Sequence, residues 1–273
     1  MPELPEVETI CRSLRPVCGR RISSVFLSPL APVEGTSPSR LKTALRDHVI
    51  NEVYRRGKYL VLRLESETGL VIHLGMSGQL RFFANLPARP KHTHLELNLS
   101  GGSLLRFIDA RRFGTLSLSF RPDGNDNPFL ARLGPDYDDP AFTVKEFISR
   151  CRRHPGLSLK AVTLDQGIAA GLGNIYACES LYRAGLNPRR RVRKTDDREL
   201  ASLLWAARES LELGIRHGGT TLRDYLDGLG QRGKMKEFLQ VYARKGLTLD
   251  GRGKVTRFFQ QGRSTWFCPE VQK

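Results

Sequence analysis

The first residues of the chain carry groups that could do covalent chemistry. Removal of Met1 in front of a residue as small as Pro2 would leave proline with a free secondary amine. The pKa of an α-amino group is about 8, so an appreciable fraction is neutral at neutral pH. A neutral amine can attack an electrophilic sugar carbon and form an iminium, whose positive charge permits elimination of neighbouring groups. Glu3 and Glu6 could supply the acid–base catalysis.

The same residues also have a purely structural interpretation. Proline and acidic residues are both favoured in the first turn of a helix, so this segment is also typical of a helix start. Val7, Ile10, Leu14 and Val17 follow at helical spacing and predict a helix over residues 3–18. The motif alone therefore does not distinguish a catalytic role from a structural one, and the rest of the sequence is needed to do so.

The charge balance indicates a polyanionic partner. Lys and Arg number 44 against 28 Asp and Glu, which gives a formal net charge of +16. Such an excess favours nucleic acid, although an architectural or ribosomal protein would show the same balance. No apolar run is long enough to cross a bilayer, and the start of the chain is acidic where a signal peptide is basic. We expect no membrane partner and a cytoplasmic, nucleoid-associated protein, or a nuclear one in a eukaryote.

The cysteines are odd in number and scattered, and they contain no C-x-x-C pair. They are expected to be reduced, mostly buried thiols: Cys11, Cys18, Cys151, Cys178 and Cys268.

Hydrophobic periodicity predicts an α+β protein. Alternation of period two between about residues 22 and 120 indicates an antiparallel β-sandwich behind the N-terminal helix. Helical spacing follows, including a long helix capped at Thr195 or Asp196 and stopped by Gly218-Gly219. The expected division is a catalytic sandwich domain over residues 1–125, a linker over 126–140, a helical domain over 141–230 and a basic β-hairpin over 231–273.

The full N-terminal motif, Pro2-Glu3-Leu4-Pro5-Glu6-Val7-Glu8, resembles the signature of the formamidopyrimidine-DNA glycosylases. Arg56-Gly57-Lys58-Tyr59-Leu60 resembles the β-hairpin that carries a lysine in this family. The resemblance implies that Pro2 is the nucleophile and Schiff-base former and that Glu3 assists opening of the sugar. It further implies that Glu6 supports the site and that Lys58 contacts the phosphate and sugar at the lesion.

Two further motifs resemble the loops that fill the space left by a flipped nucleotide. They are His73-Leu74-Gly75-Met76-Ser77-Gly78 and Asp109-Ala110-Arg111-Arg112-Phe113-Gly114. When a base leaves the stacked duplex, the gap that it leaves costs a few kcal/mol of stacking and pairing energy unless a side chain fills it. Met76 and Phe113 could wedge between bases, and Arg111 could hydrogen-bond the orphaned base. Taken singly, Met76 and Phe113 would more often be core residues.

The second half of the chain continues the resemblance. Residues 164–176 resemble a helix-two-turn-helix signature, in which Asn174 and nearby Lys160 would bind phosphate. Residues 218–225 resemble a loop that closes over an extruded purine, and this loop favours oxidised purines over oxidised pyrimidines. Its candidate recognition residues are Gly219, Thr220, Thr221, Leu222, Arg223 and Tyr225.

The resemblance fails at the zinc finger with which the family usually ends. The four ligand positions fall near Leu249 and Arg252 and at Cys268 and Val271, so only one thiol remains for a site that needs four ligands. We expect no cofactor and a zincless finger, with Arg263 at its tip gripping phosphates. Apolar contacts would hold this hairpin, from Leu249, Val255, Phe258, Phe259, Trp266 and Val271. The alternative is an engineered or decayed finger that no longer folds.

The resemblance thus implies a DNA glycosylase and AP lyase of base excision repair. A monomer is the default expectation, because nothing in the sequence suggests an oligomer. The enzyme would excise 8-oxoguanine and formamidopyrimidines from damaged double-stranded DNA through a Pro2 Schiff base with β,δ-elimination. Two alternatives stay open. One is an endonuclease VIII-like enzyme that prefers oxidised pyrimidines, and the other is an architectural DNA-binding protein without catalysis.

Overall fold

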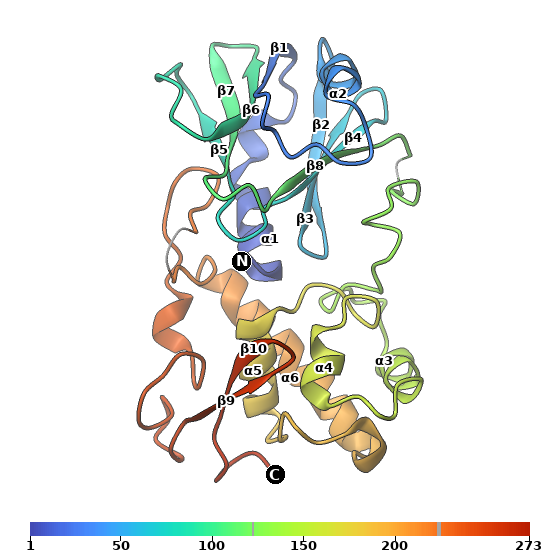
Figure 1. Ribbon diagram of the computed structural model, residues 1–273, viewed down its shortest axis with the longest axis vertical. Coiled ribbons are helices and arrows are strands. Elements are labelled where there is room, and N and C mark those ends of the chain that lie inside the picture. Colours follow the sequence, from blue (N-terminus) through green and yellow to red (C-terminus); the bar gives the residue numbers. More distant parts are fainter. Residues whose placement is uncertain (122, 223–224) are drawn as a thin grey trace. The chain divides into compact units, whose positions relative to one another are not determined.

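The computed structural model describes residues 1–121, 123–222 and 225–273 (Figure 1). It contains two compact units: unit 1 comprises residues 1–132 and 218–233, and unit 2 comprises residues 133–217 and 234–273. Unit 1 holds the predicted sandwich, and unit 2 holds the predicted helices and hairpin, so the α+β class is confirmed. None of the helices in these described ranges combines the length and hydropathy that a membrane span requires.

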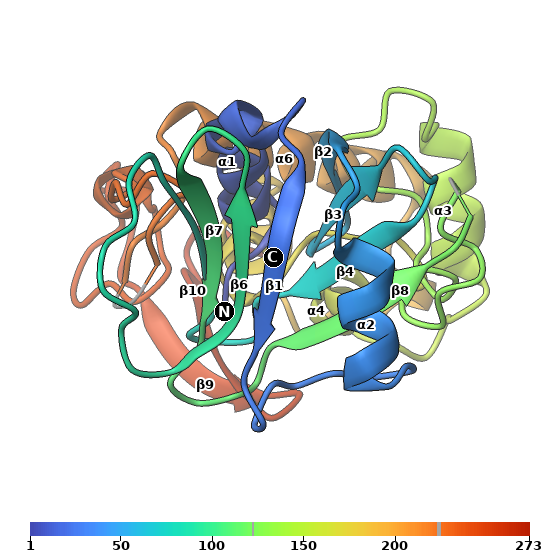
Figure 2. The same ribbon diagram turned by 90° about the horizontal axis from the view of Figure 1, so that it is seen from above.

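Unit 1 is built from two antiparallel sheets of four strands each. One has the order β1 (Ile22–Leu27), β6 (Thr93–Leu99), β7 (Ser103–Ile108) and β5 (Gln79–Phe83). The other has the order β2 (Ile50–Arg56), β3 (Tyr59–Leu64), β4 (Gly69–His73) and β8 (Thr115–Ser119). Viewed from above, the two sheets form separate layers (Figure 2). Their inward-facing Leu, Ile and Val side chains form one buried core, because alternate residues of a strand face the same side.

Helix α1 (Leu4–Ser13) contributes its apolar face to the same core, through Val7, Ile10 and Leu14. A 3-10 turn (Arg15–Val17) follows it, so the predicted continuous helix over residues 3–18 is wrong. Pro16 explains the break, because a proline disfavours helical geometry in the residue before it and supplies no N–H. A short helix, α2 (Pro38–Leu45), starts at Ser37, whose hydroxyl accepts a hydrogen bond from the Arg40 N–H.

Unit 2 contains four α-helices: α3 (Val144–Arg152), α4 (Leu159–Leu164), α5 (Asn174–Arg183) and α6 (Asp197–Arg216). Of the two caps that the sequence offered, Asp196 is the one that caps α6, in a reciprocal capping box with Glu199. Short 3-10 turns occur over Val192–Lys194 and Met235–Phe238. The predicted hairpin is also present, as β9 (Thr256–Gln260) paired with β10 (Arg263–Phe267).

The units differ from the expected domains: the expected linker over residues 126–140 is divided between them at residue 132, and one later segment returns to unit 1. Residues 218–233 follow α6 in sequence, and we expected most of them in the helical domain, but they pack with unit 1. Tyr225 joins the buried core of the sandwich. The N–H of Gly228 donates to the Ser13 hydroxyl at the end of α1. Burial of one aromatic ring and these specific hydrogen bonds outweigh chain continuity with α6.

Candidate active site

Helix α1 fixes the residues at the start of the chain. Pro2 is buried, and the Glu3 and Glu6 side chains are also buried. Glu3 is the N-cap of α1 and forms a reciprocal capping box with Glu6, in which the Glu3 N–H donates to Glu6 Oε2 at 2.7 Å. The residues predicted to do chemistry therefore also form the helix start, so the structural interpretation of the N-terminal motif is confirmed and the chemical one stays a prediction.

The other oxygen of Glu6 binds the segment that follows α6. Glu6 Oε1 accepts a hydrogen bond from the backbone N–H of Thr220 at 2.6 Å. Gly219 has a positive φ of 82°, and a Cβ there would lie 2.9 Å from Glu6 Cγ. Only glycine fits this close approach without displacing one of the two partners. The candidate recognition loop is thus attached directly to the N-terminal helix.

Three other residues of this candidate loop, Thr220, Thr221 and Tyr225, have structural partners. Thr220 is buried, and the Thr221 hydroxyl donates to the Tyr225 carbonyl oxygen at 3.2 Å. The Tyr225 hydroxyl donates to the Gly218 carbonyl at 3.1 Å, and burial raises its pKa. Leu222 is exposed, whereas Arg223 lies outside the described residues.

Lys58 lies in the turn between β2 and β3 and is buried apart from a small fraction of its surface. His73, at the end of β4, pairs with Tyr59 in the sheet register. Burial lowers the pKa of His73 to about 4, reinforced by the positive charges of Lys58 and the N-terminal amine. Lys58 and the N-terminal amine are therefore close enough to His73 for their positive charges to affect its protonation.

His73 is a site residue that the sequence did not single out. Its Nδ1 accepts a hydrogen bond from the Gly75 N–H at 3.2 Å. The proton of the neutral ring is therefore assigned to Nε2. The ring also packs against Tyr59, with 4.8 Å between the centroids. Its only sequence signal was its place two residues before Gly75.

The two loops predicted to enter DNA lie against each other. A Cβ on Gly75 would be 2.3 Å from the Phe113 carbonyl carbon, so the loops are in backbone contact. Met76 is 47% exposed and Phe113 is 52% exposed, so neither side chain belongs to the core. Both are accessible, as side chains that insert between bases must be. The Arg111 guanidinium lies 4.7 Å from the centre of the Phe113 ring.

Asp109 holds these loops together and was not identified from sequence. It is fully buried, and its Oδ1 accepts a hydrogen bond from the Ser77 hydroxyl at 2.6 Å. Its Oδ2 accepts one from the Gly114 N–H at 2.9 Å. His94 in turn contacts the Asp109 carbonyl at 2.9 Å. The carboxylate therefore connects the loop of Met76 to the loop of Phe113.

In unit 2, Asn174 begins α5, directly after Gly173 as N-cap. Its Nδ2 donates to the Ser264 carbonyl in β10 at 2.9 Å. The start of α5 and the hairpin are therefore joined by a side chain that we predicted to bind phosphate. Arg263 is exposed at the first position of β10.

Lys160 does not occupy the position that we expected. It is fully buried, and its Nζ contacts the Cys178 sulfur at 2.9 Å. An ammonium enclosed in this way does not reach a phosphate in this conformation, so the predicted phosphate contact stays a prediction. The long aliphatic stem of lysine explains this, because it can be buried along an apolar interior. All five cysteines are free thiols, and four of them are buried, as predicted.

Another buried residue missed by sequence reasoning connects α5 to the segment before the hairpin. The Glu179 carboxylate accepts hydrogen bonds from the backbone N–H groups of Gln240, Val241 and Tyr242, at 2.7 to 3.0 Å. Burial raises its pKa. Three donors on one buried carboxylate fix the path of the chain into the finger.

Apolar and aromatic contacts stabilise the finger, in which only one of the four expected zinc-ligand positions is a cysteine. Val255, Trp266 and Val271 pack against a buried cluster with Cys268, and the Phe258 ring contacts the Phe267 ring edge-on. Phe259 is 70% exposed and Leu249 is also exposed, so these two predicted contacts are wrong. Successive residues of a strand face opposite sides, which turns Phe259 outward when Phe258 turns inward.

A polar network complements this packing. Asp250 Oδ1 accepts hydrogen bonds from the Tyr182 and Thr248 hydroxyls, both at 2.7 Å, and Arg252 pairs with its other oxygen at 2.8 Å. The family's zinc does not fit here, because Val271 lies in apolar packing and Cys268 contacts Glu270. Among the described residues, no group of three or more His, Cys, Asp or Glu is arranged to hold a metal ion.

Comparisons with known proteins agree with this architecture. Residues 1–116 match the model of the formamidopyrimidine-DNA glycosylase N-terminal domain, and residues 133–225 match that of its H2TH domain. A formamidopyrimidine-DNA glycosylase of Moorella thermoacetica is 43% identical over 250 residues, covering 90% of each chain. One of Pelotomaculum thermopropionicum is 40% identical and covers 100% of this chain and 99% of its own.

Solved structures give the same result. MutM (Fpg) of Thermus thermophilus superposes with a TM-score of 0.87 at 39% identity, covering 99% of this chain and 98% of its own. An FPG mutant of Lactococcus lactis, in complex with Fapy-dG-containing DNA, has a TM-score of 0.89 at 33% identity and full coverage of both chains. The chain therefore belongs to the formamidopyrimidine-DNA glycosylase family of DNA-repair enzymes.

Proposed function

We propose that this protein is a bifunctional DNA glycosylase and AP lyase that removes oxidised purines from duplex DNA. Pro2, freed by removal of Met1, would be its nucleophile. The observation that carries this proposal is the juxtaposition of Pro2 and Glu3 with Glu6, whose carboxylate also binds the loop of Thr220. A protein that only binds DNA needs no buried pair of carboxylates beside its first residue.

The chemistry follows from these groups. The neutral Pro2 nitrogen attacks C1′, the glycosidic bond breaks, and the base leaves with its electron pair and takes up a proton. The Pro2 nitrogen gives its own proton to the Glu3 carboxylate, and Glu3 passes this proton to the ring oxygen as the sugar ring opens to the iminium. Loss of the C2′ proton then expels the 3′ phosphate, and loss of the C4′ proton expels the 5′ phosphate. Lys58 would neutralise phosphate charge during these eliminations.

The proposed substrates are 8-oxoguanine and formamidopyrimidines. Residues 218–222 support this choice, because a backbone held by Glu6 at Thr220 can present its other N–H groups to an extruded base. The Lactococcus lactis relative has been solved with Fapy-dG-containing DNA, which supports the same substrate class. Met76, Phe113 and Arg111 would fill the vacated stack, and Asn174 and Arg263 would bind phosphates.

We also propose that the finger works without zinc. Three of the four ligand positions carry Leu249, Arg252 and Val271, which offer no thiolate or imidazole. Apolar packing and the Asp250 network stabilise the hairpin instead. Arg263 would therefore reach phosphates from a metal-independent scaffold.

The test is borohydride trapping on a duplex with one 8-oxoguanine opposite cytosine, using the wild type and Pro2→Gly. Mass spectrometry of both proteins establishes whether Met1 has been removed. A covalent protein–DNA species with the wild type, lost in the variant together with the nick, would support the proposal. A second duplex with an oxidised pyrimidine measures the preference between base classes.

Two results would overturn parts of this proposal. Tight binding by the wild type without trapping, even on a preformed abasic site, would leave a DNA-binding protein without catalysis. Trapping that is stronger on the oxidised pyrimidine than on 8-oxoguanine would leave the mechanism standing and reverse the substrate class.

A further inference from the structure

We propose that the segment between α5 and α6 is a second contact surface for the phosphate backbone of duplex DNA. This segment, residues 187–195, is called the basic loop below. The proposal rests on the proposed function, since it assumes that DNA is the partner. It concerns residues outside those expected to act at the lesion, and its sequence is Asn-Pro-Arg-Arg-Arg-Val-Arg-Lys-Thr.

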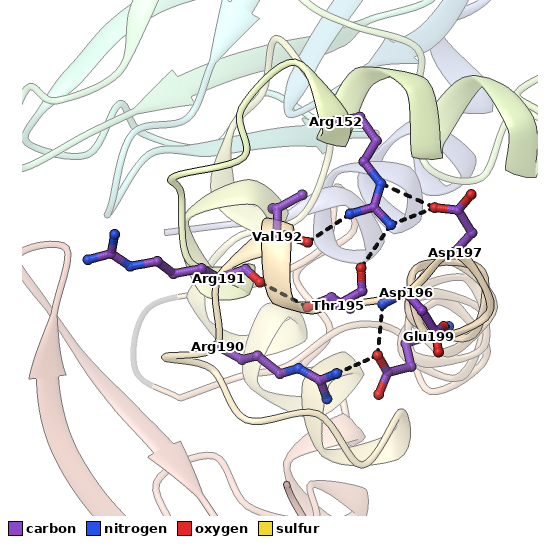
Figure 3. Close-up of polar contacts among 8 residues, drawn as sticks. All are labelled: Arg152, Arg190, Arg191, Val192, Thr195, Asp196, Asp197 and Glu199. Atoms are coloured by element: carbon purple, nitrogen blue, oxygen red, sulfur yellow. Dashed lines mark hydrogen bonds and ion pairs between the residues drawn. The ribbon is translucent and has the colours of Figure 1, made fainter.

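One arginine from α3 fixes the far end of the basic loop. The Arg152 guanidinium donates to the carbonyl oxygens of Val192 and Thr195, each at 2.8 Å (Figure 3). It also contacts the Asp197 carboxylate at 2.5 Å. Because these bonds use backbone carbonyls of the loop itself, they hold its path rather than only a side chain.

A second arginine belongs to the loop and closes it internally. Arg190 donates to the Lys194 carbonyl at 2.9 Å. It also pairs with Glu199 at 2.5 Å (Figure 3). The start of the loop is also fixed, because the Leu159 N–H donates to the Arg190 carbonyl at 2.8 Å. The loop is therefore rigid before any partner arrives, which lowers the entropic cost of binding.

The other cations of the basic loop are exposed: Arg189, Arg191, Arg193 and Lys194. Within the described part of the chain, none of these four forms an ion pair with a carboxylate. The Arg191 side chain points away from Arg152 and Asp197 (Figure 3). Like charges held close together without counter-charges destabilise the free protein, so a polyanion is the partner that relieves the repulsion.

These side chains surround a hollow of about 610 Å³. Its lining consists of the five cations of the basic loop, Asn187 and Lys273. The side chains of these described lining residues include no carboxylate and no large apolar group. An acidic protein segment would normally add apolar anchors to its charges, and this hollow offers nothing to receive them. A phosphate backbone needs only charge and hydrogen-bond donors, which arginine supplies in bidentate form.

The basic loop is also continuous with the hairpin that we expect to bind DNA. Gln260, which pairs with Arg263 at the tip of the hairpin, donates to the Ser158 hydroxyl at 2.8 Å and to the Pro188 carbonyl at 3.4 Å. The Arg189 guanidinium lies 3.8 Å from the centre of the Phe258 ring in β9. This continuity favours duplex DNA as the occupant, because one duplex could contact the hairpin and then the loop.

The test measures binding to a long undamaged duplex over a range of salt concentrations. The loop variant is R191S/R193S/K194S, and the control variant K42S/R46S/K145S removes the same charge from exposed positions elsewhere. Each lost phosphate contact reduces the slope of log affinity against log salt by about 0.9. We expect the loop variant to lose about 2 from this slope and about tenfold or more in affinity. The control should change by much less.

Three results would overturn the proposal. Equal losses in the two variants would mean that only the net charge matters. An unchanged slope in the loop variant would mean that the loop does not meet DNA. Binding of a polyglutamate peptide that is lost in the loop variant, with DNA binding intact, would assign the surface to an acidic protein segment. R191K/R193K, which keeps both charges, should retain the wild-type slope.

Failure here is distinguishable from failure of the proposed function. Binding to undamaged DNA involves no chemistry, whereas borohydride trapping by the wild type depends on Pro2 and not on the basic loop. If the wild type is trapped on DNA but the loop variant keeps the wild-type salt slope, only the loop proposal is refuted. If the loop variant has a reduced salt slope but the wild type is not trapped, only the proposed catalysis is refuted.

Discussion

The Glu6 carboxylate and the Thr220 backbone N–H meet at 2.6 Å across more than two hundred residues of sequence. The same carboxylate accepts the Glu3 N–H at 2.7 Å through its second oxygen. One side chain thus connects the start of the chain to the loop proposed to hold the damaged base. A change in that loop can therefore be transmitted to Pro2, the proposed nucleophile, without any direct contact between them.

The substitution Gly219→Ala tests this connection. A Cβ at this position would lie 2.9 Å from Glu6 Cγ and 3.0 Å from its Oε1, at a φ of 82°. Either the loop or the carboxylate must move. We expect excision of 8-oxoguanine to slow by about tenfold to a hundredfold, which corresponds to about 1.4 to 2.7 kcal/mol of barrier. Cleavage at a preformed abasic site should slow much less, because no base has to be held there.

Gly218→Ala is the matched control. Gly218 also has a positive φ, of 71°, but a Cβ there would lie 3.7 Å from its nearest neighbour. Both variants carry the backbone cost of alanine in the left-handed region, about 1 kcal/mol. Only Gly219→Ala also clashes with Glu6. Single-turnover rates that fall equally in the two variants would show that backbone strain, and not the contact with Glu6, is responsible.

Much of this site could be predicted because its signals are local. The Pro2–Glu8 motif, the period-two strands and the glycine-flanked loops of Met76 and Phe113 each lie within a few residues of sequence. The partners that organise the site come from distant segments and leave no such signal. The Asp109 carboxylate accepts a hydrogen bond from Ser77, which lies 32 residues earlier in the sequence. The Glu179 carboxylate accepts hydrogen bonds from the N–H groups of residues 240–242. A buried carboxylate with distant donors looks like any surface acid in the sequence.

The differences between expectation and structure have equally physical causes. Lys160 was assigned to phosphate because its charge lies near the α5 motif, and its long stem lets the ammonium contact Cys178 in the interior instead. The break in α1 was missed because the apolar spacing continues through Pro16, although the backbone cannot follow it. Residues 218–233 were placed with the helix that precedes them, while long-range contacts of Tyr225 place them in the sandwich.

The acid sensitivity of the finger provides the second prediction. Partial burial raises the pKa of Asp250, but hydrogen bonds from Tyr182, Thr248 and Arg252 outweigh it and hold the pKa below its usual range. A carboxylate with a lowered folded-state pKa adds stability above its unfolded pKa of about 3.9, and this stability is lost as the pH falls through the folded value. Asp250→Asn should therefore destabilise the protein at neutral pH, by about 1 kcal/mol after solvent screening.

Thermal unfolding of the wild type and Asp250→Asn across the acid range measures this effect. The difference between the two melting temperatures should be largest near neutrality and should shrink below about pH 4. Asp123→Asn is the control, since this exposed aspartate has a lowered pKa but lies outside the finger. A difference between wild type and Asp250→Asn that is constant from neutral to acid pH would contradict the role assigned to the carboxylate.

Metal removal gives the third prediction. If packing and the Asp250 network replace zinc, dialysis against a strong chelator should leave the melting temperature and DNA affinity of the protein unchanged. Elemental analysis of the purified protein should find less than one zinc per chain. A structural zinc supplies much of the folding energy of a finger, so a loss of DNA binding on chelation, restored by added zinc, would refute the metal-independent scaffold.

The last prediction separates buried from exposed cations in unit 2. Lys160 contacts the Cys178 sulfur in the interior, whereas Arg263 is exposed at the tip of the hairpin. Lys160→Met keeps the length of the side chain and removes a buried charge, a change that is often neutral or stabilising. It should leave the salt dependence of DNA binding unchanged, while Arg263→Ser should reduce the slope of log affinity against log salt by about 0.9. A reduced slope for Lys160→Met at unchanged melting temperature would instead mean that the ammonium turns outward to a phosphate when DNA binds.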